Sequence, residues 1–344
     1  MSQKFKLELN DSNALKGIAL LLLLFHHLFY IQNGKYDDVA LHIGGGIELV
    51  QYIALACKLC VSIFVFLSGY GLSVKYIENC SAKAFYLKRF TKLLANYWFI
   101  WLLFVPLGFI FGALSLDSIY GNHAIIKLFL DFLGVANCFG YYGINPTWWF
   151  MSCIILLYLI FPLIAKTRKY IWLWLVIALG AECLPFSLYV LNPIKSYLFA
   201  FVVGIICASS KKTEYILGSA WMKYIAPVAF VALFAIRNII PYGQLLDGVI
   251  AVFLAVTYKE FISSMKGLGR SLEFIGKHSM NIFLFHTFIY YIYFPGLIYW
   301  SRNPILIYMT LLAACLCVSM MIEWLKRTTG FDGSVDRLIR KIAR

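Results

Sequence analysis

Charged residues are scarce in this chain of 344 residues: Asp, Glu, Lys and Arg together make up only 13%, whereas hydrophobic residues make up 62%. Long polar stretches are also missing, since the longest, 115–146, has only about thirty residues, too few for a domain with its own core. The chain lacks internal repeats, low-complexity linkers and an acidic tail. These absences exclude an ordinary soluble domain, so any chemistry must take place among the apolar segments or at their ends.

The apolar segments are long enough to cross a hydrocarbon layer of about 30 Å. They predict an all-α fold, a polytopic membrane bundle of about ten transmembrane helices. The expected spans are 14–33, 47–74, 91–114, 147–166, 170–189, 193–209, 221–239, 244–263, 279–300 and 304–325. Residues 124–140 fit an interfacial or re-entrant segment, and no small-residue cleavage site of a signal peptide follows the first span.

The net charge of +14 follows the pattern of membrane topology. Loops rich in Lys and Arg alternate with loops poor in them, and the rich loops lie on the side of both termini. We therefore expect a multi-pass protein of the cell membrane, with both termini in the cytoplasm and no nucleic-acid partner. The expected domains are a transmembrane domain, 1–325, and a basic cytoplasmic tail, 326–344, forming a helix on the membrane surface in contact with lipid.

Two adjacent histidines, His26 and His27, lie within the first apolar run, which Lys16 opens. A charged side chain at membrane depth costs roughly 2.5 kcal/mol or more, so ionisable residues there point to a function. Lys16 and His27 are about three helical turns apart and share one helix face, whereas His26 points about 100° away and fits a packing role. Because a neutral imidazole can take a proton from a hydroxyl group or become acylated itself, we expect His27 and Lys16 to be catalytic.

The cysteines do not indicate a metal site. Cys57 and Cys60 have the spacing of a C-x-x-C motif, but no second pair and no histidine is spaced to complete a zinc site. We interpret both as reduced core residues and expect no metal ion.

Several further motifs form a set with the first apolar run. They are the basic residue and histidine in Lys16–His27, the aromatic-rich run Phe64–Tyr70 with its Ser-Gly pair, the basic cluster Lys88–Lys92, and the segments Trp148–Ser152, Gly276–Ser279 and Phe283–His286. In this order, over nearly the whole chain, the set resembles the acyltransferase 3 family of integral membrane acyltransferases. That family usually has arginine at the position of Lys16.

The resemblance implies an enzyme of the O-acetyltransferase kind. It would move an acyl group, expected to be acetyl, from cytoplasmic acetyl-CoA or another acyl-CoA to a hydroxyl of a cell-surface or lipid-linked saccharide, with His27 as general base or acyl carrier. Binding of the acyl-CoA is expected at Lys88, Arg89, Lys92 and Ser68. Basic residues at helix ends also serve orientation alone, and a Ser-Gly pair also fits close helix packing. A homo-oligomer is compatible with the sequence.

The acceptor is expected to bind near a second group of residues. They are Trp148, Trp149, His286 and Asp37. The tryptophans also fit an aromatic belt at the membrane interface, which we favour, and His286 also fits a hydrogen bond between helices. Asp38 and Glu48 are further candidates, beside Asp37, to orient His27.

A second class of function stays open, a proton-coupled transporter or lipid flippase that uses His27, Lys58 and His286 as a relay. The sequence has no inverted repeat and no matching pair of Gly- or Pro-interrupted helices, which argues against this class. A structural scaffold is a third class, but it gives no reason for Lys16 and His27 to share one face.

Overall fold

The computed structural model describes residues 4–30, 46–76, 81–183 and 190–342. Its α-helices are α1 (Leu9–Phe29), α2 (Gly46–Ala56), α3 (Leu59–Lys75), α4 (Ala82–Ile110), α5 (Leu116–Tyr120), α6 (Ala124–Phe132), α7 (Trp149–Lys166), α8 (Ile171–Cys183), α9 (Asn192–Lys195), α10 (Leu198–Ser209), α11 (Lys211–Leu217), α12 (Met222–Arg237), α13 (Asp247–Thr257), α14 (Lys266–Lys277), α15 (Ser279–Thr287), α16 (Pro295–Ile298), α17 (Pro304–Thr328) and α18 (Phe331–Ile342). Short 3₁₀ segments are η1 (Ala136–Phe139), η2 (Pro146–Trp148), η3 (Arg168–Tyr170) and η4 (Gly243–Leu246), and π-helical segments are η5 (Tyr258–Ile262) and η6 (Phe288–Tyr293). No strand occurs within these ranges, which confirms the all-α prediction.

Five helical segments of the described residues are long and apolar enough to cross a membrane. They are Leu9–Phe29, Leu49–Lys75, Ala82–Ile110, Pro146–Lys166 and Pro304–Thr328. A sixth is added if α11 and α12, which meet at 89°, form one broken span. The remaining apolar runs form shorter or interrupted helices, so ten spans and cytoplasmic termini stay predictions.

The predicted span 279–300 illustrates why hydropathy overestimates continuous helices. Its residues form α15, then the π-helical segment η6, and then the single turn α16 that begins at Pro295. Proline has no backbone N–H to donate, so it begins a helix more readily than it continues one. Because Phe, Ile and Tyr are equally apolar in each of these conformations, their hydropathy does not reveal the breaks.

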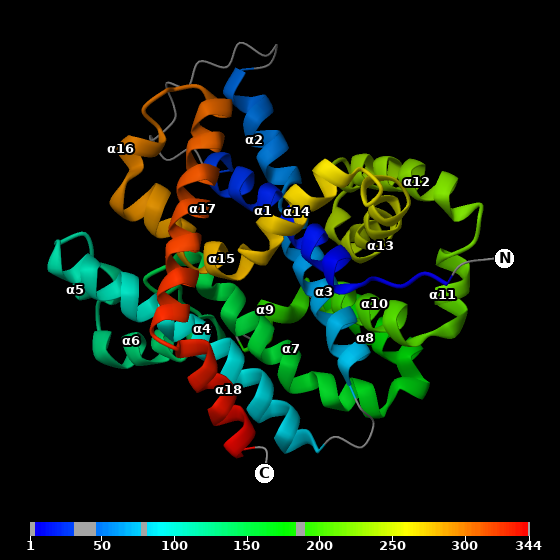
Figure 1. The fold of residues 1–344 in the computed structure, drawn as a ribbon, viewed down its shortest axis with the longest axis horizontal. Helices are drawn as coiled ribbons and strands as arrows, with labels where there is room; N and C mark the ends of the chain where they lie inside the picture. The colour runs from blue at the N-terminus through cyan, green and yellow to red at the C-terminus, as the bar shows by residue number, and fades with distance from the viewer. Residues whose placement is uncertain (1–3, 31–45, 77–80, 184–189, 343–344) are drawn as a thin grey trace.

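Helix α1 lies in the middle of the molecule, where it crosses α14 and packs beside α3 (Figure 1). A Cβ atom at Gly17 would collide with a backbone carbonyl of α14, and one at Gly276 with a backbone carbonyl of α1. Helices α3 and α10 make a similar contact at Gly69. Small residues let helix backbones touch in this way, so the glycine of the Ser-Gly pair serves close packing.

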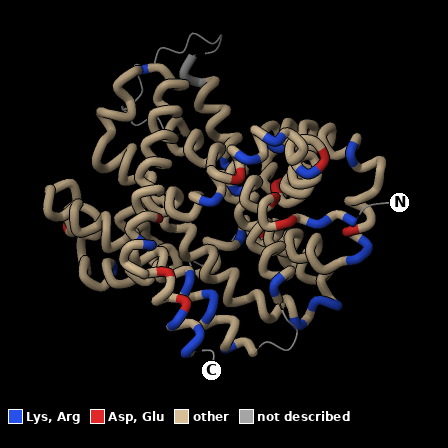
Figure 2. The backbone as a smooth tube through the Cα atoms, viewed as in Figure 1, with Lys and Arg blue, Asp and Glu red and all other residues tan. Residues whose placement is uncertain are grey.

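Lysine and arginine gather near the C-terminus, around α18 and the start of α4 (Figure 2). The helix expected in the tail is α18, which packs against α4 with the Phe331 and Phe99 rings 4.7 Å apart. Helix α17 ends at Thr328, three residues beyond the predicted domain boundary at 325, and Lys326 within it is buried. The Lys326 Nζ donates hydrogen bonds to the side-chain oxygens of Asn96 and Asn281, at 3.0 and 2.9 Å. Contact of α18 with lipid stays a prediction.

Candidate active site

Two cavities adjoin each other within the bundle, since two residues line both of them. The first, called the basic cavity, has a volume of about 290 Å³, and its polar lining is Lys16, Ser68, Lys75, Arg89, Tyr158 and Ser279. The second, called the histidine cavity, has a volume of about 750 Å³, and its lining includes His26, His27, Lys58, Asn137, Trp149 and Tyr290. Helix α1 therefore contributes to both cavities, with Lys16 at one and His27 at the other.

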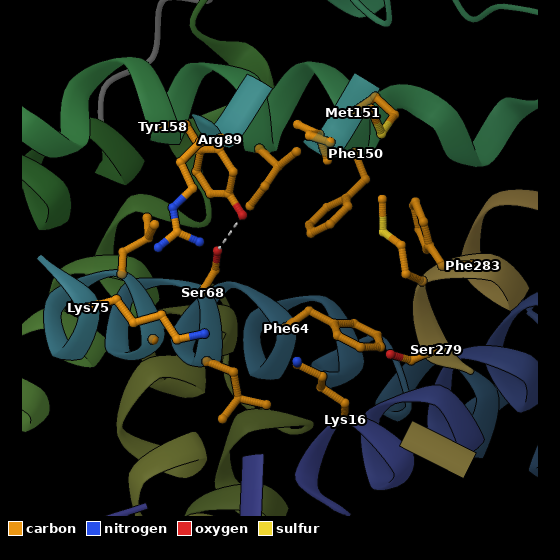
Figure 3. A pocket seen from close by; sticks show the side chains of 16 residues that line it. Lys16, Phe64, Ser68, Lys75, Arg89, Phe150, Met151, Tyr158, Ser279 and Phe283 are labelled. Atoms are coloured by element: carbon orange, nitrogen blue, oxygen red, sulfur yellow. Dashed lines mark hydrogen bonds between the residues drawn. The ribbon is translucent and has the colours of Figure 1, made fainter. Parts of the chain in front are cut away.

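The basic cavity collects positive charge from three helices. Lys16 of α1, Lys75 of α3 and Arg89 of α4 line it, and Figure 3 shows Lys75 and Arg89 together at one end. Beside them the Ser68 hydroxyl donates a hydrogen bond to the Tyr158 oxygen at 3.3 Å. No Asp or Glu is among the described residues of the lining. Such a cavity suits an anionic group, above all a phosphate, which lysine and arginine bind as charge and as a planar fork.

The predicted basic cluster of α4 divides between two faces of the helix. Arg89 is half-buried and lines the basic cavity, whereas Lys88 and Lys92 are exposed and do not line it. Lys88 and Lys92 lie four residues apart and so share a face, from which Arg89 is turned by about 60–100°. The geometry brings Lys16, Ser68 and Arg89 together and leaves the two lysines of the cluster outside.

The histidine cavity places the imidazoles of two distant helices side by side. The ring centroid of His27 lies 5.1 Å from that of His286 on α15. His26 instead points at α2, where its Nδ1 lies 2.6 Å from the carbonyl oxygen of Ala54. His26 therefore joins α1 to α2, while His27 faces His286.

The hydrogen bonds of His286 fix its tautomer. Its Nδ1 lies 3.0 Å from the carbonyl oxygens of both Ile282 and Phe283, and because a carbonyl oxygen only accepts, Nδ1 must carry the proton. The Nε2 atom then carries a lone pair, and it is buried without a hydrogen-bond partner. A buried acceptor beside the His27 ring is suited to receive a proton or hydrogen bond from His27.

The two adjacent tryptophans have different surroundings. Trp148 is buried in the core, outside the linings of both cavities, and its Nε1 donates a hydrogen bond to the carbonyl oxygen of Leu284 at 2.9 Å. The same oxygen accepts a hydrogen bond from the Asn145 amide at 3.1 Å, just before the π-helical segment η6. Trp148 thus joins η2 to α15 and is not part of an exposed aromatic belt. Trp149 lines the histidine cavity and stacks on Tyr197 at 5.5 Å.

The carboxylates predicted near His27 cannot be placed, because Asp37 and Asp38 lie outside the described residues, as does the side chain of Glu48. Lys58 is exposed, lies in the break between α2 and α3, and lines the histidine cavity. Within the described part of the chain, no three His, Cys, Asp or Glu side chains come close enough to hold a metal ion. Cys57 and Cys60 are buried free thiols.

Sequence reasoning missed one cation of the basic cavity. Lys75 was not among the residues expected at the donor site, yet a helical signal was present, because it follows Ser68 by seven residues, about two turns. Phe64, Ser68 and Gly71 complete the same face, and all of them line the cavity. The tyrosines of the histidine cavity carried no such signal, because they come from separate segments, among them Tyr30, Tyr197 and Tyr290.

The fold is thus a bundle of apolar helices, with a cavity lined by three cations and a second cavity that contains a pair of histidines. The acyltransferase domain model of the acyltransferase 3 family matches residues 9–324. The chain belongs to this family and is a membrane acyltransferase. Comparisons with curated proteins and with solved structures gave no match. The family match does not favour a transporter or flippase.

Proposed function

We propose that this membrane acyltransferase moves an acyl group, acetyl in the simplest case, from cytoplasmic acyl-CoA to a hydroxyl on the other side of the membrane. The acceptor is a cell-surface or lipid-linked saccharide, and His27 is the general base or acyl carrier. The observation that carries this proposal is the order of the two cavities along α1, with Lys16 in the basic cavity and His27 in the histidine cavity. A donor with phosphates at one end and an acyl group at the other fits this order.

The donor side rests on charge. Coenzyme A carries its phosphates at the end far from the thioester, and Lys16, Lys75 and Arg89 supply three cations for them. A volume of about 290 Å³ suits the thin pantetheine arm better than the whole nucleotide, so the nucleotide would lie at the mouth of the cavity. Phosphates do not cross an apolar core, but an acyl group does.

The reaction requires a proton acceptor beside the acceptor hydroxyl. His27 takes the hydroxyl proton, the hydroxyl oxygen bonds to the thioester carbonyl carbon, the carbon–sulfur bond breaks, and coenzyme A leaves as a thiolate that is then protonated. In the acyl-carrier form, an imidazole nitrogen of His27 makes the first attack and the hydroxyl the second. In both forms, the Nε2 lone pair of His286 is the group available to hold or take the proton of the other His27 nitrogen.

The acceptor side rests on size and aromatic lining. The histidine cavity, of about 750 Å³, is lined by Trp149 and several tyrosines, which suits a sugar ring because it presents both an apolar face and hydroxyl groups. Lys58, also in the lining, suits a phosphate of a lipid-linked saccharide.

The test is transfer of label from radioactive acetyl-CoA to a glycan and lipid extract by the purified protein in detergent. His27→Ala should lower transfer by about 10²–10⁴-fold, the usual contribution of a general base. His26→Ala should change it much less, because His26 faces the Ala54 carbonyl. Transfer that survives His27→Ala would refute the assignment, and no transfer by the wild type to any fraction would refute the function.

The donor site has its own matched controls on one helix. Arg89→Ala should raise the KM for acetyl-CoA by about tenfold, since hydrogen bonds to charged groups contribute roughly 1.5 kcal/mol or more. Lys88→Ala and Lys92→Ala should leave it nearly unchanged, because both side chains are exposed and outside the cavity. An equal effect of all three would indicate general surface charge rather than a site. Release of one coenzyme A per protein without acceptor would distinguish the acyl carrier from the general base.

A further inference from the structure

The basic cavity and the histidine cavity share a wall. Phe150 of α7 and Phe283 of α15 are the two residues that line both cavities. Figure 3 shows them at the end of the basic cavity opposite to Lys75 and Arg89. A group that passes from the cationic end to His27 therefore meets these two rings.

The rings leave no passage between them. Their centroids are 5.1 Å apart and their planes are inclined by 67°, an edge-to-face contact. Carbon atoms pack at about 3.5–4.0 Å, so a methylene chain between two rings needs roughly 7–8 Å. Phe150 and Phe283 must therefore separate before a thioester can pass between them.

The wall stands directly in front of the two imidazoles. The Phe283 ring centroid lies 6.5 Å from that of His286, which lies 5.1 Å from that of His27. The backbone carbonyl of Phe283 also accepts one of the Nδ1 hydrogen bonds that fix the His286 tautomer. Phe150 follows Trp149, whose ring touches it edge-on at 6.0 Å. One ring thus belongs to the helix of His286, and the other to the helix that carries Trp149 of the acceptor cavity.

We propose that Phe150 and Phe283 form a gate between the two cavities and determine that the acyl group goes to the acceptor hydroxyl rather than to water. The inference rests on the proposed function. With the rings closed, the thioester in the basic cavity is kept from His27 and from water in the histidine cavity. If the gate stood open, His27 would activate water, whose oxygen would bond to the thioester carbonyl carbon; the carbon–sulfur bond would break and yield free carboxylic acid and coenzyme A thiol.

The first experiment measures coenzyme A release without acceptor and acetyl transfer with acceptor, in wild type, Phe150→Ala and Phe283→Leu. Phe150 is half-buried, and leucine at Phe283 keeps most of the buried volume, so both variants should fold. The matched control is Phe253→Ala, another half-buried phenylalanine, which lies on α13 outside the linings of both cavities. We expect hydrolysis to rise about tenfold in Phe150→Ala and less in Phe283→Leu, and to stay at the wild-type rate in Phe253→Ala. Equal hydrolysis in all four proteins, while the wild type still transfers acetyl, would overturn the gate and leave the proposed function intact.

A second experiment does not depend on catalysis. In vesicles of mixed orientation, a membrane-impermeant maleimide is added outside to Lys75→Cys, which reports the basic cavity, or to Asn137→Cys, which reports the histidine cavity. With the gate closed, the outside reagent reaches only one of the two cavities in each protein orientation. The labelled fractions of Lys75→Cys and Asn137→Cys, each corrected for the background of the parent protein, should therefore sum to one. Adding Phe150→Ala should raise the labelled fraction of Asn137→Cys beyond this complement, and adding Phe253→Ala should not. Labelling of Asn137→Cys that Phe150→Ala does not change would overturn the gate, even if the wild type proved to have no transferase activity.

Discussion

Asp131 gives the chain a stability that depends on pH. It lies in α6, outside the five candidate spans, and is 1% exposed. One carboxyl oxygen accepts hydrogen bonds from the Tyr120 hydroxyl at 2.6 Å and the Ile144 backbone N–H at 2.9 Å. Burial outweighs these bonds and raises the pKa of Asp131 from 3.8 to about 6. Compared with the unfolded chain, the folded state therefore binds a proton at Asp131 more readily.

The sign of the pH dependence follows from this raised pKa. The stabilising contribution is complete below pH 3.8 and is lost as the pH rises through about 6. A rise of this size corresponds to about 3 kcal/mol. Below pH 4 the protein should thus gain about 3 kcal/mol from this carboxyl group relative to pH 7.

The assay compares the wild type with Asp131→Asn in thermal unfolding followed by tryptophan fluorescence from pH 4 to pH 7. The asparagine side-chain oxygen can accept the same two hydrogen bonds but does not ionise. Other groups titrate in this range in both proteins, so the difference between the two curves isolates Asp131. We expect the variant to gain stability over the wild type as the pH rises. Parallel curves would show that Asp131 is already ionised in the fold, and the reasoning from burial would be wrong.

Three further substitutions test separate parts of the fold. Asp247→Asn should lower the free energy of unfolding by about 3–5 kcal/mol, because Asp247 forms a buried ion pair with Arg237 at 2.8 Å. In thermal unfolding, the double variant Arg237→Met with Asp247→Leu should be less destabilised than Asp247→Asn alone. Gly276→Ala should lower the free energy of unfolding by about 1–3 kcal/mol, because its Cβ would collide with a carbonyl of α1. A Cβ at Gly267 in the same helix meets nothing within 4 Å, so Gly267→Ala should not destabilise the protein, and equal melting temperatures of the two variants would contradict this. Trp148→Phe should lower stability by about 0.5–1.5 kcal/mol, because the Leu284 carbonyl loses one hydrogen bond and keeps the one from Asn145. It should leave the KM for donor and acceptor unchanged, since Trp148 lines neither cavity, and a raised acceptor KM would place it at the substrate after all.

The sequence was most informative where one helix decides the geometry. The separation of Lys16 and His27 along α1 follows from helical rise alone, and the structure places them in two successive cavities. The family could also be predicted, because its motifs follow one another over most of the chain. The helical class followed from composition, although hydropathy did not show that 279–300 is interrupted.

The sequence was least informative where two helices must meet. That His286 faces His27, and that Phe150 meets Phe283, depends on how α1, α7 and α15 pack, which no local pattern contains. Trp148 shows the same difficulty, because an aromatic residue at a helix end has the same pattern whether it faces lipid or, as here, a carbonyl of a neighbouring helix.

The glycine contact between α1 and α14 bears on which parts of the enzyme can move. Gly17 and Gly276 bring two backbones together without side chains between them, so the helices cannot approach further at this point, and we expect them to move as one unit. Helix α15 follows α14 after His278 alone, so Phe283 and His286 are carried by the same fixed unit as Lys16 and His27. We therefore expect α1, α14 and α15 to keep their positions when the donor enters. The helix that moves would be α7, and Phe150 would be the ring that is displaced from its contact with Phe283.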